Sequence, residues 1–151
     1  MAYHLVMALH LLKLCVGVET IDDLADHIDR RLAGQRSRGE KPEQFHTTRM
    51  VPKRRDELLA GGSLYWVIKG NVQVRQKLID IRPFTDAEGI SRCHLVMEPV
   101  LAPTLWQPRR AFQGWRYLKA GDAPGDLGTG GEGLEDMPAE MRRELAALGL
   151  L

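Results

Sequence analysis

The stretch from Gly61 to Arg82 constrains the fold more than any other part of the chain. It joins two segments rich in β-branched and aromatic residues through a Gly70-Asn71 turn, the pattern of a β-hairpin. The first segment, Leu64 to Ile68, is apolar throughout, as in a strand buried on both faces. The second alternates apolar and polar residues, and the alternation shifts by one residue at Leu78-Ile79. This shift predicts a β-bulge with Ile79 and Ile81 inward, and hence a small sheet that curls towards a barrel.

Periodicity and boundary signals place the other elements around this hairpin. Thr20 is the expected N-cap of a helix that ends at Gly34, and Pro138 marks the first turn of a second amphipathic helix. Further strands are expected over 8–18, 45–51, 90–98 and 111–118, with a short helix over 53–60. The prolines of segment 99–108 exclude it from the centre of a sheet. The fold class is therefore α+β: a small curled mixed β-sheet or barrel with flanking helices.

The chain length fits one globular domain, which we place over residues 1–118. Residues 119–137 are rich in glycine and aspartate and are expected to be a linker. Residues 138–151 are expected to form the C-terminal amphipathic helix. The G-x-G-x-x-G pattern at Gly128, Gly130 and Gly133 falls in this linker, without the preceding strand that a dinucleotide site requires.

The net charge of +1 hides an uneven distribution of charge. Residues 45–117 hold 12 lysines and arginines against 6 acidic residues, whereas residues 118–151 hold 3 against 7. A basic central region indicates an anionic partner, nucleic acid first, although the two parts could equally attract each other. The isolated Cys15 and Cys93 are interpreted as reduced thiols of a cytoplasmic protein. The apolar N-terminal run has neither the flanks of a signal peptide nor the length of a membrane span, so no membrane is expected as a partner.

No residue set in the sequence identifies a reaction. We find no diagnostic spacing for a catalytic pair, no metal-ligand motif and no cofactor motif, so catalytic residues, metal and cofactor are all predicted to be none. His46 and His94 are more simply interpreted as structural histidines. Whether the chain is an enzyme stays open on this basis.

Cations occur together with aromatic residues at three places: before the hairpin, within it, and in the last strand. Guanidinium groups bind phosphate, aromatic faces stack on bases, and a glutamine amide reads a base edge. The opposing interpretation is that the aromatic residues are core and the cations a solvated face. The predicted ligand-binding residues are Arg49, Lys53, Arg54, Trp66, Lys69, Arg109, Arg110, Gln113, Trp115 and Arg116.

Several long segments resemble, in order, an uncharacterised bacterial domain-of-unknown-function family of about this length. They are LHLLKLCVG (9–17), HTTRMVPKRRDELLAGGSLYWVIKG (46–70), VRQKLIDIR (74–82), PRRAFQGWRYL (108–118) and DAPGDL (122–127). The resemblance implies no activity and no catalytic residue. It also implies that residues 1–6 are an upstream start extension, because members often begin at the equivalent of Met7.

The order of elements is more weakly similar to that of PUA-like proteins, which include the ASCH and EVE domains. This similarity implies a curled-sheet barrel that binds RNA or modified nucleobases in a cleft beside it. The chain lacks the glycine-lysine-x-x-glutamate-x-arginine motif of ASCH domains, so ASCH-type hydrolysis is not implied. A likeness of fold alone does not fix function.

The leading hypothesis is a non-enzymatic module that binds RNA or a nucleotide in a basic, aromatic cleft. An alternative is a small hydrolase or transferase acting on a nucleotide-like anion, with His46 or His94 as the base. A third is a protein-interaction module that uses its C-terminal helix. The oligomeric state stays open.

Overall fold

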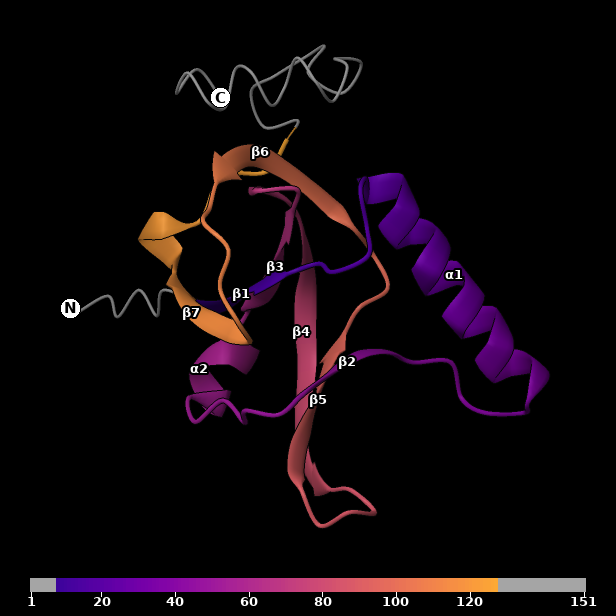
Figure 1. Cartoon of the computed structure of the whole chain (residues 1–151). Helices are drawn as coiled ribbons and strands as arrows, with labels where there is room; N and C mark the ends of the chain where they lie inside the picture. The colour runs from indigo at the N-terminus through magenta and orange to yellow at the C-terminus, as the bar shows by residue number, and fades with distance from the viewer. Residues whose placement is uncertain (1–7, 128–151) are drawn as a thin grey trace, which may run out of the picture.

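The predicted hairpin forms the centre of a seven-stranded mixed sheet in the computed structural model, which describes residues 8–127 (Figure 1). Two helices, α1 (Ile21–Ser37) and α2 (Arg55–Leu59), and a 3-10 turn, η1 (Ala120–Asp122), accompany it. The strands are β1 (Leu9–Leu14), β2 (Gln44–Thr48), β3 (Ser63–Ile68), β4 (Asn71–Thr85), β5 (Ser91–Met97), β6 (Ala102–Pro108) and β7 (Trp115–Lys119).

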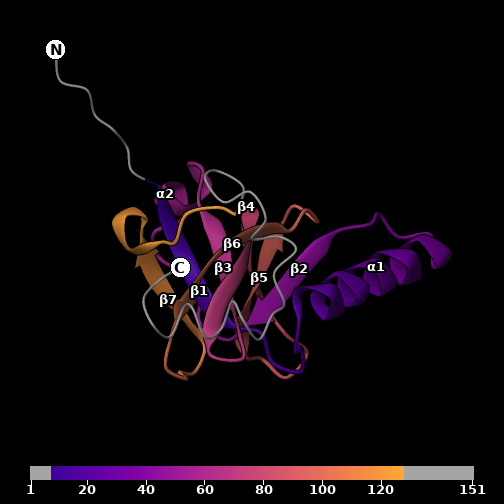
Figure 2. The same ribbon diagram turned by 90° about the horizontal axis from the view of Figure 1, so that it is seen from above.

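The strands lie in the order β2-β5-β4-β3-β1-β7, and β6 pairs with β4. Within residues 8–127 only β1 and β3 pair in parallel, and the chain between them passes through α1, β2 and α2. Figure 2 shows this order from one side of the molecule to the other, with β7 and α1 at opposite ends. The arrangement fits the expected α+β class and a mixed sheet with flanking helices.

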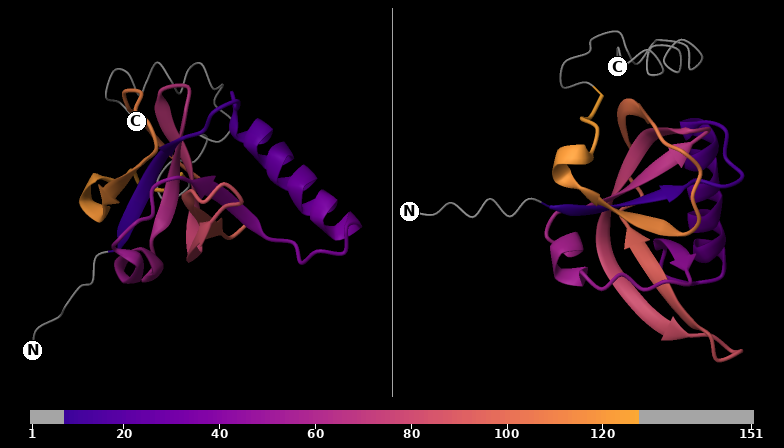
Figure 3. Two further views of the ribbon diagram at one scale, coloured as in Figure 1. Left: turned by 60° about the horizontal axis from the view of Figure 1, so that its bottom comes forward. Right: turned by 60° about the vertical axis from the view of Figure 1, so that its left-hand side comes forward.

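The long strand β4 produces the curl of the sheet. Its first half pairs with β3 and β6, and its second half pairs with β5. A register shift between Leu78 and Asp80 separates the halves and confirms the predicted bulge. Beyond it, β4 and β5 extend as a two-stranded arm (Figure 3). Of the two predicted alternatives the structure fits the curled sheet and not the barrel, because among residues 8–127 the edge strands β2 and β7 form no ladder with each other.

Side chains bridge the two edges where backbone pairing does not. The indole N–H of Trp115 on β7 donates to the carbonyl of Met50, just beyond β2, at 2.6 Å. The hydroxyl of Tyr117 accepts hydrogen bonds from the backbone N–H groups of Lys53 at 2.9 Å and Arg54 at 3.3 Å. These bonds fix the segment that follows β2 against the opposite edge of the sheet.

The two faces of the sheet carry separate apolar clusters. The larger lies inside the curl and under α1, and includes Leu11, Leu64, Trp66, Ile81 and Leu95. The smaller lies on the other face, where Leu12, Tyr65, Val67, Val72 and Leu118 meet the partly buried Phe112 and Ala123. Because neighbouring residues of β1 and β3 belong to opposite clusters, both strands are buried on both sides, as the apolar run Leu64 to Ile68 predicts.

Helix α1 begins as predicted and ends later than predicted. Thr20 Oγ1 accepts the N–H of Asp23 at 3.1 Å, which caps the helix. Gly34 does not end it, because Gln35 is buried in the last turn and its amide binds both backbone groups of Glu43. The chain turns instead at Gly39, whose φ of +73° is the left-handed conformation typical of a residue after a helix. No helix within residues 8–127 is long and apolar enough to cross a membrane.

Two details of the hairpin differ from the sequence prediction. The turn is formed by Lys69 and Gly70, with φ of +48° and +82°, one residue earlier than expected, and Ile68 pairs with Asn71. Ile79 was expected to point inward but is 53% exposed, whereas Ile81 is buried. The bulge leaves one residue of the strand unpaired and directs its side chain to solvent, and that residue is Ile79.

The first part of the expected linker packs on the sheet. Lys119 ends β7, residues 120–122 form η1, and Asp126 forms a bidentate ion pair with Arg75 of β4 at 2.7 and 2.8 Å. Residues 119–127 therefore cover the second face of the sheet, because this charge pair attaches them to it. Residues 1–7 and 128–151 lie outside the described residues, and with them lie the start extension, the G-x-G-x-x-G pattern and the C-terminal helix.

We expect Gly62→Ala to destabilise the fold by about 1–3 kcal/mol. A Cβ at this position would lie 2.2 Å from the carbonyl oxygen of Leu9 and 2.3 Å from that of Leu58, and both are backbone atoms that cannot move aside. Urea unfolding measures the effect. Gly121→Ala is the matched control, since a Cβ there meets nothing within 4 Å. Equal unfolding midpoints for the two variants would contradict this account of how β3 and α2 pack.

Candidate functional site

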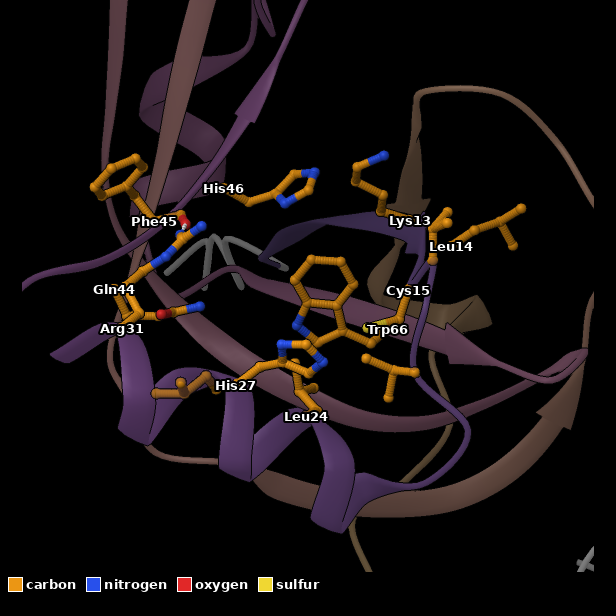
Figure 4. A pocket seen from close by; sticks show the side chains of 13 residues that line it. Lys13, Leu14, Cys15, Leu24, His27, Arg31, Gln44, Phe45, His46 and Trp66 are labelled. Atoms are coloured by element: carbon orange, nitrogen blue, oxygen red, sulfur yellow. Dashed lines mark hydrogen bonds between the residues drawn. The ribbon is translucent and has the colours of Figure 1, made fainter. Parts of the chain in front are cut away.

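A pocket of about 260 Å³ lies between α1, the end of β1, the start of β2 and the middle of β3 (Figure 4). One side of its wall is apolar, formed by helix residues Leu24 and Ile28 and by Val18 of the loop before the helix. The other side is polar. The residues that give it chemistry are Lys13, Cys15, His27, Arg31, Gln44, Phe45, His46 and Trp66.

Lys13 is the central charge of this pocket. It interrupts the apolar strand β1, and its register partners on the two neighbouring strands are Trp66 of β3 and Trp115 of β7. Its side chain is half-buried, and this burial lowers the pKa of its ammonium group. No carboxylate among residues 8–127 lines the pocket or pairs with Lys13. A desolvated cation without a counter-ion favours an incoming anion.

His46 lies beside Lys13 on the polar side. In Figure 4 its imidazole extends toward the side chain of Lys13, and both lie on the same side of the indole of Trp66. Burial lowers the pKa of His46 to about 4, and the positive charges of Lys13 and Arg31 contribute to the decrease. The imidazole is therefore neutral near pH 7 and offers one hydrogen-bond donor and one acceptor.

Trp66 forms the aromatic floor of the pocket. Its ring lies 5.4 Å from that of His46 in an edge-to-face arrangement. Its indole N–H donates to Gln76 Oε1 at 2.9 Å, and Gln76 Nε2 donates to the carbonyl of Glu98 at 2.9 Å. Because this chain of bonds holds the N–H inside the sheet, only the apolar part of the indole is left for a ligand.

Gln44 and Arg31 form the far side of the pocket. Gln44 is 7% exposed, and its Oε1 is buried without a hydrogen-bond partner among the described residues. An unpaired buried acceptor costs about 1–3 kcal/mol, so a ligand that donates to this amide gains affinity. Arg31 donates to the carbonyl of Phe45, and its guanidinium lies 5.1 Å from the centre of the Phe45 ring.

The remaining groups limit the chemistry of the site. Burial raises the pKa of the Cys15 thiol to about 11, so the thiol is protonated and a weak nucleophile at neutral pH. No group of three metal-ligating side chains occurs within residues 8–127. The pocket therefore combines a desolvated amine, a neutral imidazole, an amide and an aromatic wall, and this set suits the binding of a small anion with an apolar or planar body.

The two predicted tryptophans have different surroundings. Trp66 lines the pocket but is 3% exposed, so it is a wall rather than an open stacking platform. Trp115 is 6% exposed, lies edge-on to Tyr117 at 4.8 Å and does not line the pocket. Its ring is part of the core and its N–H donates to the carbonyl of Met50, so this placement does not favour the expected stacking on a base, which stays a prediction.

The predicted cations do not converge on the pocket. Arg49 and Lys53 are exposed on the segment after β2, where Arg54 pairs with Glu57. At the far end of the hairpin, Lys69 pairs with Glu19 at 3.5 Å and the backbone N–H of Arg109 donates to the carbonyl of Gly70. The remaining three also lie outside the pocket lining: Arg110, Gln113 and Arg116. A ligand-binding role for these surface residues stays a prediction.

His94, the other candidate base, is placed away from the pocket. Its ring stacks on Phe84 at 4.3 Å and meets Phe45 edge-on at 4.4 Å. Thr47 Oγ1 lies 3.3 Å from its Nδ1. These contacts give His94 a structural role in the β4–β5 arm.

A second hollow, of about 310 Å³, lies on the opposite side of the sheet beside residues 120–126. Its charged groups already bind each other: Arg75 pairs with Asp126 and donates to Ser63 Oγ at 3.0 Å. His10 Nδ1 accepts the N–H of Ser63 at 2.9 Å. Because these groups are satisfied within the fold, this hollow is the weaker candidate for a ligand site.

Sequence reasoning named His46 and Trp66 but missed Lys13, His27, Arg31 and Gln44. One signal was present: Lys13 is a single cation in the apolar run LHLLKLCVG. A charge at that position must be satisfied by a partner or exposed to a cavity. Its neighbours could not be found in the same way, because they come from a helix and a strand that only the fold brings to β1.

His46 gives a test of this arrangement through pH. Its folded pKa of about 4 lies below the ordinary 6.5, so its contribution to stability is present above pH 6.5 and is lost as the pH falls towards 4. Between pH 7 and pH 5 we expect a loss on the order of 1 kcal/mol from this residue, given its partial exposure. Unfolding free energies of wild type and His46→Gln at both pH values measure it. An equally steep loss in His46→Gln would show that His46 is not buried in its neutral form.

Comparison with known proteins adds one result. No curated protein and no solved structure matches the chain. A family described as "Protein of unknown function (DUF1489)" matches residues 11–151, which includes every residue of the pocket. The resemblance to an uncharacterised family is confirmed, and this chain is a member of the DUF1489 family.

Proposed function

We propose that the protein is a cytoplasmic nucleotide-binding module, and that it binds a planar base and its phosphate in the pocket between α1 and the sheet. The observation that carries the proposal is the position of Lys13. Its half-buried ammonium lies beside the apolar surface of Trp66 in a pocket to which residues 8–127 contribute no carboxylate. A nucleotide supplies two groups that complement this pocket: an anion for the ammonium of Lys13 and a flat ring with hydrogen-bonding edges for the apolar wall.

The size of the pocket supports a single nucleotide. Ligand pockets commonly measure about 300–1,000 Å³, and this pocket of about 260 Å³ lies just below that range, so it holds no more than one nucleotide. Lys13 and Arg31 attract the phosphate, while Trp66 and the apolar side of α1 contact the ring. Gln44 lines the pocket, and because its buried Oε1 has no partner among the described residues, a hydrogen bond from an exocyclic amine would satisfy it.

A hydrolase or transferase is less well supported by the same geometry. His46 has a pKa of about 4, which makes it a weak base at neutral pH. No carboxylate among the described lining residues orients its ring, and the Cys15 thiol is protonated. Binding therefore requires fewer additional assumptions than catalysis.

The nucleotide has two possible sources: a free molecule or the end of an RNA strand. Arg49 and Lys53 are exposed and unpaired among residues 8–127, and they follow β2, the strand that carries His46. Contacts of these cations with further phosphates would make RNA binding weaken as salt rises. A free nucleotide would show little of this dependence.

We expect Lys13→Met to weaken binding of adenosine 5′-monophosphate about tenfold to a hundredfold, because a charge-assisted hydrogen bond contributes about 1.5–3 kcal/mol. Lys53→Met, which removes an exposed cation outside the pocket, is the matched control and should change the affinity less than about twofold. Calorimetric titration with the nucleotide, with adenosine and with a short single-stranded RNA measures these effects.

The outcomes separate the alternatives. Loss of affinity in Lys13→Met for the free nucleotide supports the pocket. If RNA binding weakens steeply as salt rises, and Lys53→Met makes this dependence less steep, the nucleotide in the pocket belongs to an RNA strand. No binding of any of these ligands to the wild-type protein, or equal affinities of the two variants, would refute the proposal.

A further inference from the structure

We propose that Lys13 is the reactive amine of a carbonyl-binding site: it forms an imine with an aldehyde or ketone group of the ligand that enters the α1 pocket. The inference uses the pocket assigned above to a nucleotide-like anion but concerns a different property, the covalent reactivity of one side chain. It makes the ligand class more specific, namely an anion that also carries a carbonyl group.

The environment of Lys13 meets the first requirement, an amine that loses its proton easily. The side chain starts from β1 between two tryptophan positions and ends in the pocket, with no ion pair among residues 8–127. The titratable groups that line the pocket with it are Cys15, His27, Arg31 and His46, and none of them is an anion at neutral pH. Desolvation without a counter-ion favours the neutral amine, as in known Schiff-base lysines.

The second requirement is a group that moves protons during the reaction. The lone pair of Nζ attacks the carbonyl carbon, the π electrons pass to the oxygen, and proton transfer gives a carbinolamine. Loss of that oxygen as water, with loss of the remaining proton from nitrogen, gives the C=N bond. Amine and carbonyl thus become imine and water, with no oxidant or reductant.

His46 is placed to relay these protons. Its neutral imidazole extends toward the side chain of Lys13 in Figure 4, and the positive charge of Lys13 is one of the causes of its lowered pKa. Although His46 is a weak base, a neutral imidazole can accept a proton at one ring nitrogen while it gives up the proton of the other, so it can pass a proton from nitrogen to oxygen without becoming charged. An imine formed on Lys13 would lie against the apolar surfaces of Trp66, Leu24 and Ile28, which limit the approach of water from that side and slow its hydrolysis.

Reductive methylation with formaldehyde and cyanoborohydride tests the reactivity directly. The reagent traps the imine at each lysine, and peptide mass spectrometry reports the rate at each site. We expect Lys13 to react several-fold faster at pH 7 than the exposed Lys77 of β4, since each unit by which an amine pKa is lower gives about ten times more neutral amine. Lys77 is a suitable reference because it is solvent-exposed and forms no ion pair within the described part of the chain. Modification of Lys13 no faster than Lys77 would refute the proposal.

Two further arms separate this inference from nucleotide binding. Adenosine 5′-monophosphate should slow modification of Lys13 and leave that of Lys77 unchanged. If Lys13 reacts fast but the nucleotide does not slow the reaction, the proposal of nucleotide binding is refuted and the proposal of a reactive amine is supported. If the nucleotide slows the reaction but Lys13 reacts no faster than Lys77, nucleotide binding is supported and the reactive amine is refuted.

Periodate-oxidised adenosine 5′-monophosphate, a dialdehyde that carries a phosphate, tests the ligand class. It should label Lys13 faster than periodate-oxidised adenosine, which carries the same aldehydes without the charge, because Arg31 attracts the anion. Arg31→Met should abolish this difference, while Arg36→Met, which removes an exposed arginine of the same helix outside the pocket, should not. Equal labelling by the two dialdehydes would show that the site does not select anions.

Discussion

The bend in β4 is the constraint on which the rest of the structure depends. One strand pairs with β3 and β6 along its first half and with β5 along its second half, and the bulge between Leu78 and Asp80 allows the change of direction. The buried bonds from Trp66 to Gln76 and from Gln76 to Glu98 hold this corner from inside. Without the bend, β2 would be carried away from β1 on the far edge of a flat sheet. His46 would then lie far from Lys13.

The curl also explains why an open sheet encloses a pocket. The sheet does not close, so its edges need other partners, and Trp115 and Tyr117 supply them by binding the segment after β2. Helix α1 covers the remaining gap beside β2, where Leu24 and Ile28 pack and Arg31 reaches the carbonyl of Phe45. The pocket is what remains between a curled sheet and a helix that covers it only in part. Its polar groups come from all of these elements, as is common for sites at such junctions.

The electrostatic properties of the pocket depend more on the burial of its charged groups than on the number of charged residues in the chain. The surface arginines of the basic central region are solvated or paired, for example Arg54 with Glu57 and Arg82 with Glu43 and Asp80. Such pairs contribute little to affinity. Lys13 is one charge, but it is partly desolvated and has no counter-ion among residues 8–127, and it adds to the burial that lowers the pKa of His46 and keeps the imidazole neutral. Both proposals, nucleotide binding and imine formation, follow from this one desolvated amine.

The sequence alone determined the elements that depend on local patterns. Thr20 and the apolar stripe of α1, the apolar strand β3, and the phase shift at Leu78 were all readable, because capping, burial on both faces and alternation are properties of neighbouring residues. The sequence did not predict positions where long-range contacts outweigh local signals. At Gly34 the helix continues, because Gln35 in the next position binds the backbone of Glu43. The candidate site depends on the same distinction. The sequence indicated that cations and tryptophans would meet, but it did not indicate which cation. Strand register places Lys13, rather than one of the abundant arginines, beside Trp66 and Trp115, and no carboxylate of residues 8–127 lines its pocket.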